Sequence, residues 1–159
     1  MKSVVVFFLI AVASCTAWAQ APNAAGSTDD ISGMYTFLQD GEFVQINVED
    51  GSRVTGFISR YGESDADKGA FLDHLFTDGS LKGNHIQFKT RAVHGVSYAF
   101  NGTVERGPAK TTADEGYRVI RGKLIEYTED ANKKTSARSR EVTLKSFAQD
   151  AMSDKPQKD

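Results

Sequence analysis

The sequence predicts an all-β protein, an antiparallel meander of about eight strands that forms a closed or partly open barrel. Three observations support this fold. Runs of alternating apolar and polar residues, rich in Val, Ile, Tyr, Phe and Thr, recur along the chain. Short turn sequences such as Asp40-Gly41 and Asp50-Gly51 separate the runs, and such connections are too short for parallel crossovers. Residues 31–149 are enough for one domain with a sizeable core.

The alternation indicates where the strands lie. Seven runs are clear, at residues 32–39, 42–49, 52–61, 85–93, 96–105, 117–127 and 138–147. The segment 64–79 allows either a capped helix or a strand. We favour a strand over 70–77, because its neighbours are strands and Gly69 would weaken a helix.

The first two hairpins predict a core face. A two-residue turn at Asp40-Gly41 places Tyr35 opposite Ile46, and a three-residue loop at 49–51 places Ile46 opposite Val54. These registers collect the aliphatic residues on one side of the sheet. The expected core face is Tyr35, Phe37, Val44, Ile46, Val48, Val54 and Ile58.

The opposite face of these strands mixes aromatic and hydrogen-bonding side chains. Rigid aromatic walls with a few amides are typical of small-molecule pockets. The same composition also occurs on the outside of a barrel and in protein–protein patches. The candidate ligand-binding residues are Tyr35, Phe43, Gln45, Phe57 and Tyr61, although the register places Tyr35 with the core.

Catalytic, metal and nucleic-acid sites have little support. The three histidines, His74, His85 and His94, fit no zinc motif, and we expect them to be exposed or in turns. His74 with Asp73 is a faint candidate for a general base. No metal or cofactor is predicted. The net charge of −2, without a basic cluster, argues against nucleic acid as a partner.

The N-terminus is predicted to be a targeting segment. Lys2 precedes an apolar run over 4–13, and Ala17-Trp18-Ala19 offers a cleavage site that would make residues 1–19 a signal peptide. A competing interpretation is lipidation at Cys15, because Val12–Cys15 resembles a lipobox. The chain would then be a membrane-anchored lipoprotein; otherwise it would be periplasmic or extracellular.

The two flanks of the domain are predicted to be disordered. Residues 20–30 are small and polar, like a linker, and residues 150–159 form a polar tail.

One stretch resembles the calycins, the group that includes the lipocalins and avidins. Gly33-Met34-Tyr35 stands where lipocalins carry Gly-x-Trp, and Val54–Ser59 follows the Thr-Gly…Ser rhythm of the avidins. The resemblance covers about thirty residues and implies an up-and-down barrel. The single tryptophan is Trp18, inside the signal, so the tryptophan cage that avidins build around biotin would be missing. The whole chain also resembles exported bacterial proteins, which implies a compartment and no activity.

The sequence therefore favours an exported, non-catalytic binding module for an apolar or amphipathic small molecule, monomeric or weakly dimeric. The alternative is a structural or partner-binding envelope protein. A small hydrolase or isomerase would need two titratable groups to converge inside the barrel.

Overall fold

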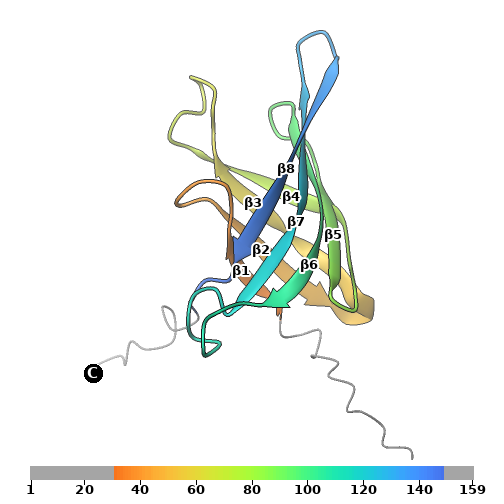
Figure 1. The fold of residues 1–159 in the computed structure, drawn as a ribbon. Helices are drawn as coiled ribbons and strands as arrows, with labels where there is room; N and C mark the ends of the chain where they lie inside the picture. Colours follow the sequence, from red (N-terminus) through yellow and green to blue (C-terminus); the bar gives the residue numbers. More distant parts are fainter. Residues whose placement is uncertain (1–30, 149–159) are drawn as a thin grey trace, which may run out of the picture.

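The computed structural model describes residues 31–148 of the protein. Eight strands form one antiparallel sheet in chain order, so the predicted all-β meander is confirmed (Figure 1). The strands are β1 (Gly33–Thr36), β2 (Phe43–Glu49), β3 (Arg53–Tyr61), β4 (Phe71–Lys82), β5 (His85–Thr90), β6 (Val96–Arg106), β7 (Arg118–Glu129) and β8 (Thr135–Lys145). The segment 70–77 is a strand, as predicted, and β4 continues to Lys82.

The sheet curls until its first and last strands meet. Tyr35 of β1 forms a bridge to Ser146, and the amide of Phe147 donates to the carbonyl of Met34 at 2.9 Å. We call this contact the seam. Because β1 has only four residues, the seam covers one end of β8, and the barrel is partly open above it.

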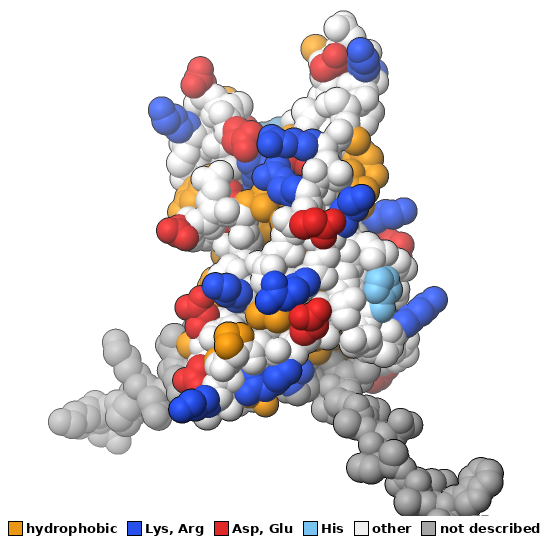
Figure 2. All heavy atoms as spheres, in the orientation of Figure 1, with side chains coloured by type: hydrophobic (Ala, Val, Ile, Leu, Met, Phe, Trp, Pro, Cys, Tyr) orange, Lys and Arg blue, Asp and Glu red, His pale blue; other side chains and the backbone are white. Residues whose placement is uncertain are grey.

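The loops divide between two ends of the barrel. Loops 37–42, 62–70, 91–95 and 130–134 lie at the upper end in Figure 1, and loop 107–117 lies at the lower end. Loop 62–70 and the β7–β8 hairpin stand up as two prongs with a notch between them (Figure 2). Acidic and basic side chains are interspersed on the face drawn there.

The predicted registers of the first two hairpins are wrong by two residues. Tyr35 pairs with Val44, and Ile46 pairs with Gly56. The first turn is longer than two residues, because the amide of Phe37 donates to the carbonyl of Glu42. The second is the short 3-10 turn η2 (Asp50–Ser52), one residue later than predicted. A shift of two residues keeps every side chain on its face.

The predicted core face is therefore confirmed despite the register error. Tyr35, Val44, Ile46, Val54 and Ile58 are buried, and Phe37 and Val48 pack against them. Strands β4–β8 complete the cluster with Leu81, Ile86, Phe88, Tyr98, Phe100, Ile120, Leu124 and Leu144. These side chains fill most of the barrel interior. Each fully buried apolar side chain contributes about 1.5–3 kcal/mol to the stability of the fold.

Gly56 allows β2 and β3 to approach closely. Its φ is +147°, and a Cβ atom there would lie 1.9 Å from the carbonyl oxygen of Gln45. No side chain fits at that distance, so this position of the barrel requires glycine.

The predicted signal (1–19), linker (20–30) and tail (150–159) lie outside the described residues and stay predictions. Across residues 31–148, no helix is long and apolar enough to cross a membrane.

Candidate functional site

The interior of the barrel changes from apolar to polar near its upper end. Alternation along each strand directs these side chains inward: Arg60 follows Ile58 by two residues, and Tyr98 precedes Phe100 by two. The resulting group, which we call the polar belt, consists of Glu42, Arg60, His74, Tyr98, Glu126 and Arg140.

Arg60 is the centre of the polar belt. The residue is 5% exposed, and its guanidinium donates to the hydroxyl of Tyr98 and to the carboxylate of Glu63. Its Nε lies 3.9 Å from Oε1 of Glu42. Burial opposes its charge, but Tyr98 and Glu63 outweigh that effect and raise the pKa of Arg60. Arg60 therefore remains a buried cation held by its neighbours.

The network extends from Arg60 through Glu42 on one side and through Tyr98 towards Glu126 and Arg140 on the other. Glu42, only 2% exposed, also accepts the backbone amides of Gln39 and Tyr61 at 3.2 and 3.1 Å. Across the sheet, Arg140 donates to Glu126 at 3.2 Å, and Glu126 lies opposite Tyr98. Burial raises the pKa of Tyr98 to about 12, so its hydroxyl stays protonated at neutral pH.

His74 is buried in the polar belt, so the prediction that it is exposed or in a turn is wrong. It is 1% exposed, and its ring meets that of Tyr98 edge-on at 5.2 Å. Neither ring nitrogen makes a hydrogen bond of good geometry among residues 31–148. Burial and then the charge of Arg60 lower the pKa of His74, and the nearby backbones of Arg91 and Val96 offset part of this effect. The neutral ring carries one donor and one acceptor nitrogen.

Asp73 does not form a catalytic pair with His74. The two residues are consecutive on β4 and point to opposite faces of the sheet. Asp73 accepts a hydrogen bond from the Ser59 hydroxyl at 2.7 Å on the outside. Within the described chain, no group of three or more His, Cys, Asp or Glu residues is arranged to hold a metal ion.

A cavity of about 200 Å³ opens above the polar belt, and we call it the mouth. Arg60 and His74 line its inner side, and Leu72, Val93 and Val96 form an apolar wall. Loop 62–70 and the turn before β6 form its rim. The mouth therefore combines an apolar wall with a polar floor.

A hydrogen bond joins the two sides of this rim. His94 Nδ1 lies 2.8 Å from Oδ2 of Asp67, which also accepts the Ser64 hydroxyl at 2.6 Å. The bonds from Ser64 and His94 lower the pKa of Asp67. His94 has a φ of +48° and Gly95 one of +78°, as a two-residue type I′ hairpin turn requires.

The five residues predicted from sequence do not meet at one place. Tyr35 is in the core, where its hydroxyl donates to the carbonyl of Ile31 at 2.7 Å. Phe43 and Phe57 contact each other edge-on at 5.8 Å on the outside of the barrel. Gln45 lies on the same outer face and donates to Asn47 at 3.1 Å.

Tyr61 is the one of the five that lines the mouth. Its ring also packs against Phe71 at 4.4 Å, on the outside of β3 and β4. Further along the same face, beyond the Ser59–Asp73 pair, Leu75 lies opposite Phe57. We call Phe43, Phe57, Tyr61, Phe71 and Leu75 the outer aromatic patch.

Sequence reasoning missed Glu42, Arg60, Tyr98, Glu126 and Arg140. A signal for two of them exists in the sequence. Glu42 and Arg60 stand at positions where the alternation through Val44 and Ile58 calls for an inward side chain. A charged residue in the core register needs a buried partner, which marks it as a candidate site residue.

Comparison with known proteins identifies the fold. No protein-family model matches the chain, and no curated protein matches it either. A rhizavidin–biotin complex is 13% identical, with a TM-score of 0.57 over 76% of this chain and 96% of that one. Rhizavidin is 11% identical, with a TM-score of 0.58 over 80% of this chain and 88% of that one. A short afifavidin–biotin complex is 15% identical, with a TM-score of 0.53 over 74% of this chain and 89% of that one.

These likenesses confirm the calycin resemblance at the level of the fold: the chain is similar to the avidin-type calycin barrels.

Proposed function

We propose that this protein is an exported, non-catalytic binding protein, monomeric or weakly dimeric, that holds a small apolar or amphipathic molecule in the mouth. The observation that carries the proposal is the pairing of an apolar wall with a polar floor. Leu72, Val93 and Val96 form the wall, and Arg60 and His74 supply the polar groups of the floor. A few polar groups in an apolar cavity are what orient a ligand.

The size of the mouth limits the ligand. At about 200 Å³ it is smaller than the roughly 300–1,000 Å³ of ordinary ligand pockets. The core below is filled by side chains such as Phe88 and Leu124. These features support a compact ligand that sits above the polar belt.

The structural neighbours give the first probe. Rhizavidin and short afifavidin have been solved in complex with biotin, and biotin has a polar ring system and an apolar chain. The described chain contains no tryptophan, so biotin itself serves as a probe and is not the ligand we propose.

The test is mass spectrometry of the full chain, expressed with its own N-terminal segment, under native and then denaturing conditions. We expect an additional native mass that is lost on denaturation. Replacing Leu72 by Trp would fill the mouth and remove this mass, whereas Ala99→Trp, on the outer face, would retain it. A retained mass in the Leu72→Trp protein, or no additional mass and no biotin binding by calorimetry, would contradict the proposal.

The same spectra test export. A chain that begins at Gln20 supports secretion, and a lipidated chain that begins at Cys15 supports a membrane anchor. An intact Met1 in protein recovered from its native host would contradict export.

A second candidate function is partner binding through the outer aromatic patch. Phe71 and Leu75 are 48% and 42% exposed, and clustered exposed apolar side chains mark interaction surfaces. A photo-crosslinker at Leu75 should then give one defined product in the native envelope, and Phe71→Ser should weaken that product. A crosslinker at Lys133, on the distant β7–β8 hairpin, is the control. Equal labelling from both positions would argue against a docking surface.

A further inference from the structure

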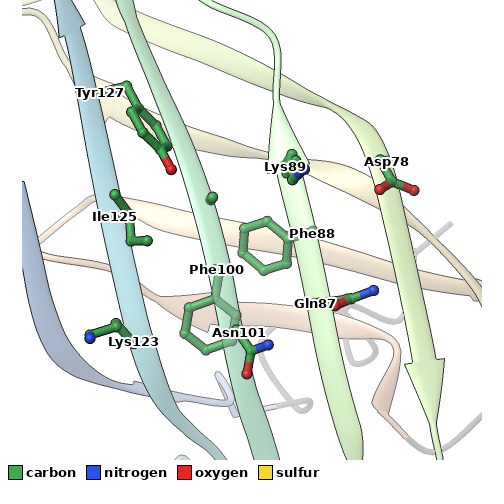
Figure 3. Close-up of a pocket in the computed structure, with 10 residues that line it drawn as sticks. Asp78, Gln87, Phe88, Lys89, Phe100, Asn101, Lys123, Ile125 and Tyr127 are labelled. Atoms are coloured by element: carbon green, nitrogen blue, oxygen red, sulfur yellow. The ribbon is translucent and has the colours of Figure 1, made fainter. Parts of the chain in front are cut away.

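A second concave site lies on the outside of the barrel, away from the mouth. It spans β4, β5, β6 and β7 and has a volume of about 290 Å³ (Figure 3). We call it the outer hollow. Its residues differ entirely from those that line the mouth, so its occupancy is independent of the proposed function.

The hollow exists because a small residue stands among large ones. Ala99 faces outward on β6, between its cross-strand partners Lys89 on β5 and Ile125 on β7. Ile125 and Tyr127 form one wall. Phe88 and Phe100 also belong to the lining, but their rings stack at 5.1 Å on the core side of the sheet, so they contribute through their backbone. The apolar surface of the hollow therefore comes from Ala99 at its floor and from Ile125 and Tyr127 on one wall.

The rim of the hollow is basic. Lys89 and Lys123 are exposed and line it from different strands (Figure 3). Asp78 stands opposite Lys89 in the sheet and Glu141 stands opposite Lys123, but among residues 31–148 neither ammonium group forms an ion pair with a carboxylate. Asp78 is the one acid in the lining, and Asn101 adds an exposed amide. Two lysines against one aspartate leave the lining with a net positive charge.

We propose that the outer hollow binds a small amphipathic anion, with a flat apolar body and one carboxylate or sulfonate group. The body would cover Ala99 and Ile125, and the anionic group would lie between Lys89 and Lys123. Burying the apolar body supplies most of the affinity. The exposed ammonium groups add roughly two- to fivefold each and select for the anion.

The probes are a matched pair of dyes: 1-anilinonaphthalene-8-sulfonate, and N-phenyl-1-naphthylamine, which lacks the sulfonate. Fluorescence titration of the full chain should show saturable binding of both dyes. Ala99→Trp should weaken the binding of both dyes by roughly tenfold or more, because the larger side chain fills the hollow. The double variant Lys89→Gln, Lys123→Gln should weaken binding of the sulfonate dye only, by roughly four- to twenty-five-fold at low salt.

Two controls separate this site from the others. Leu72→Trp fills the mouth and Phe71→Ser alters the outer aromatic patch, and neither should change binding of the sulfonate. Circular dichroism checks that each variant folds, and the lysine pair tests the proposal even if Ala99→Trp does not fold. Three results would overturn the proposal: sulfonate binding that survives the lysine changes, binding lost in Leu72→Trp, or a dimer in sedimentation that Ala99→Trp converts to monomer.

Discussion

Removing the guanidinium of Arg60 while leaving the carboxylate of Glu42 in place should destabilise the fold by about 3–5 kcal/mol. The substitution is Arg60→Met, which keeps an unbranched side chain of similar length. Glu42 is 2% exposed and Arg60 5%, so water replaces the lost partner only poorly. Glu42 would keep only its bonds from the amides of Gln39 and Tyr61.

This loss would be a large fraction of the roughly 5–15 kcal/mol by which an ordinary domain is stable. Urea unfolding followed by far-UV circular dichroism measures it. With a slope of about 1.5–2 kcal/mol per molar urea, the midpoint should fall by roughly 1.5–3 M. Adding Glu42→Gln to Arg60→Met should restore at least half of this loss, because the buried charge is removed together with its partner.

Arg53→Met is the matched control. Arg53 also pairs with a glutamate, Glu49 at 3.6 Å, but its side chain is 71% exposed. Exposed pairs contribute about 0–1 kcal/mol, so this midpoint should move little. If Arg60→Met cost no more than Arg53→Met, or if Glu42→Gln gave no recovery, the polar belt would not be an electrostatic network.

Two other substitutions test specific contacts. His74→Phe should remove a pH dependence: the folded-state pKa of His74 is lowered, so the unfolded chain binds the proton first, and wild-type stability should fall as the pH drops through about 6.5. Denaturation at pH 8 and pH 5.5 measures this, and an unchanged difference in the variant would contradict a buried neutral imidazole. Gly56→Ala should cost more than about 2 kcal/mol, because its Cβ would meet the Gln45 carbonyl at 1.9 Å. Gly33→Ala, at a similar φ of +153° with nothing within 4 Å, should cost clearly less in thermal unfolding, and equal losses would show that φ alone is responsible.

The fold could be predicted from sequence because period-2 alternation decides which face each side chain takes. The segment 70–77 illustrates this, since alternation placed Leu72, His74 and Phe76 on one side and all three line the interior or the mouth. Register is less determined by alternation. A shift of two residues leaves both faces unchanged, so the pattern could not distinguish Val44 from Ile46 as the partner of Tyr35.

The candidate site could be predicted only in part, because its contacts join distant segments. Arg60 and the Tyr98 hydroxyl that it contacts are 38 residues apart. Asp67 and His94 are 27 apart and come from two different hairpins. No local pattern encodes such contacts. The aromatic residues that did stand out, Phe43 and Phe57, stood out because they are apolar on the outer face of the sheet.

The seam has a consequence for the folding kinetics of this protein. Every other strand pairing joins neighbours in the chain through a loop, so those hairpins form with little loss of chain entropy. The bridge between Tyr35 and Ser146 instead joins the two ends of the described chain. We expect the seam to form after the rate-limiting step. Substitutions there, such as Phe147→Pro, which removes the amide that donates to Met34, should accelerate unfolding and leave the refolding rate nearly unchanged.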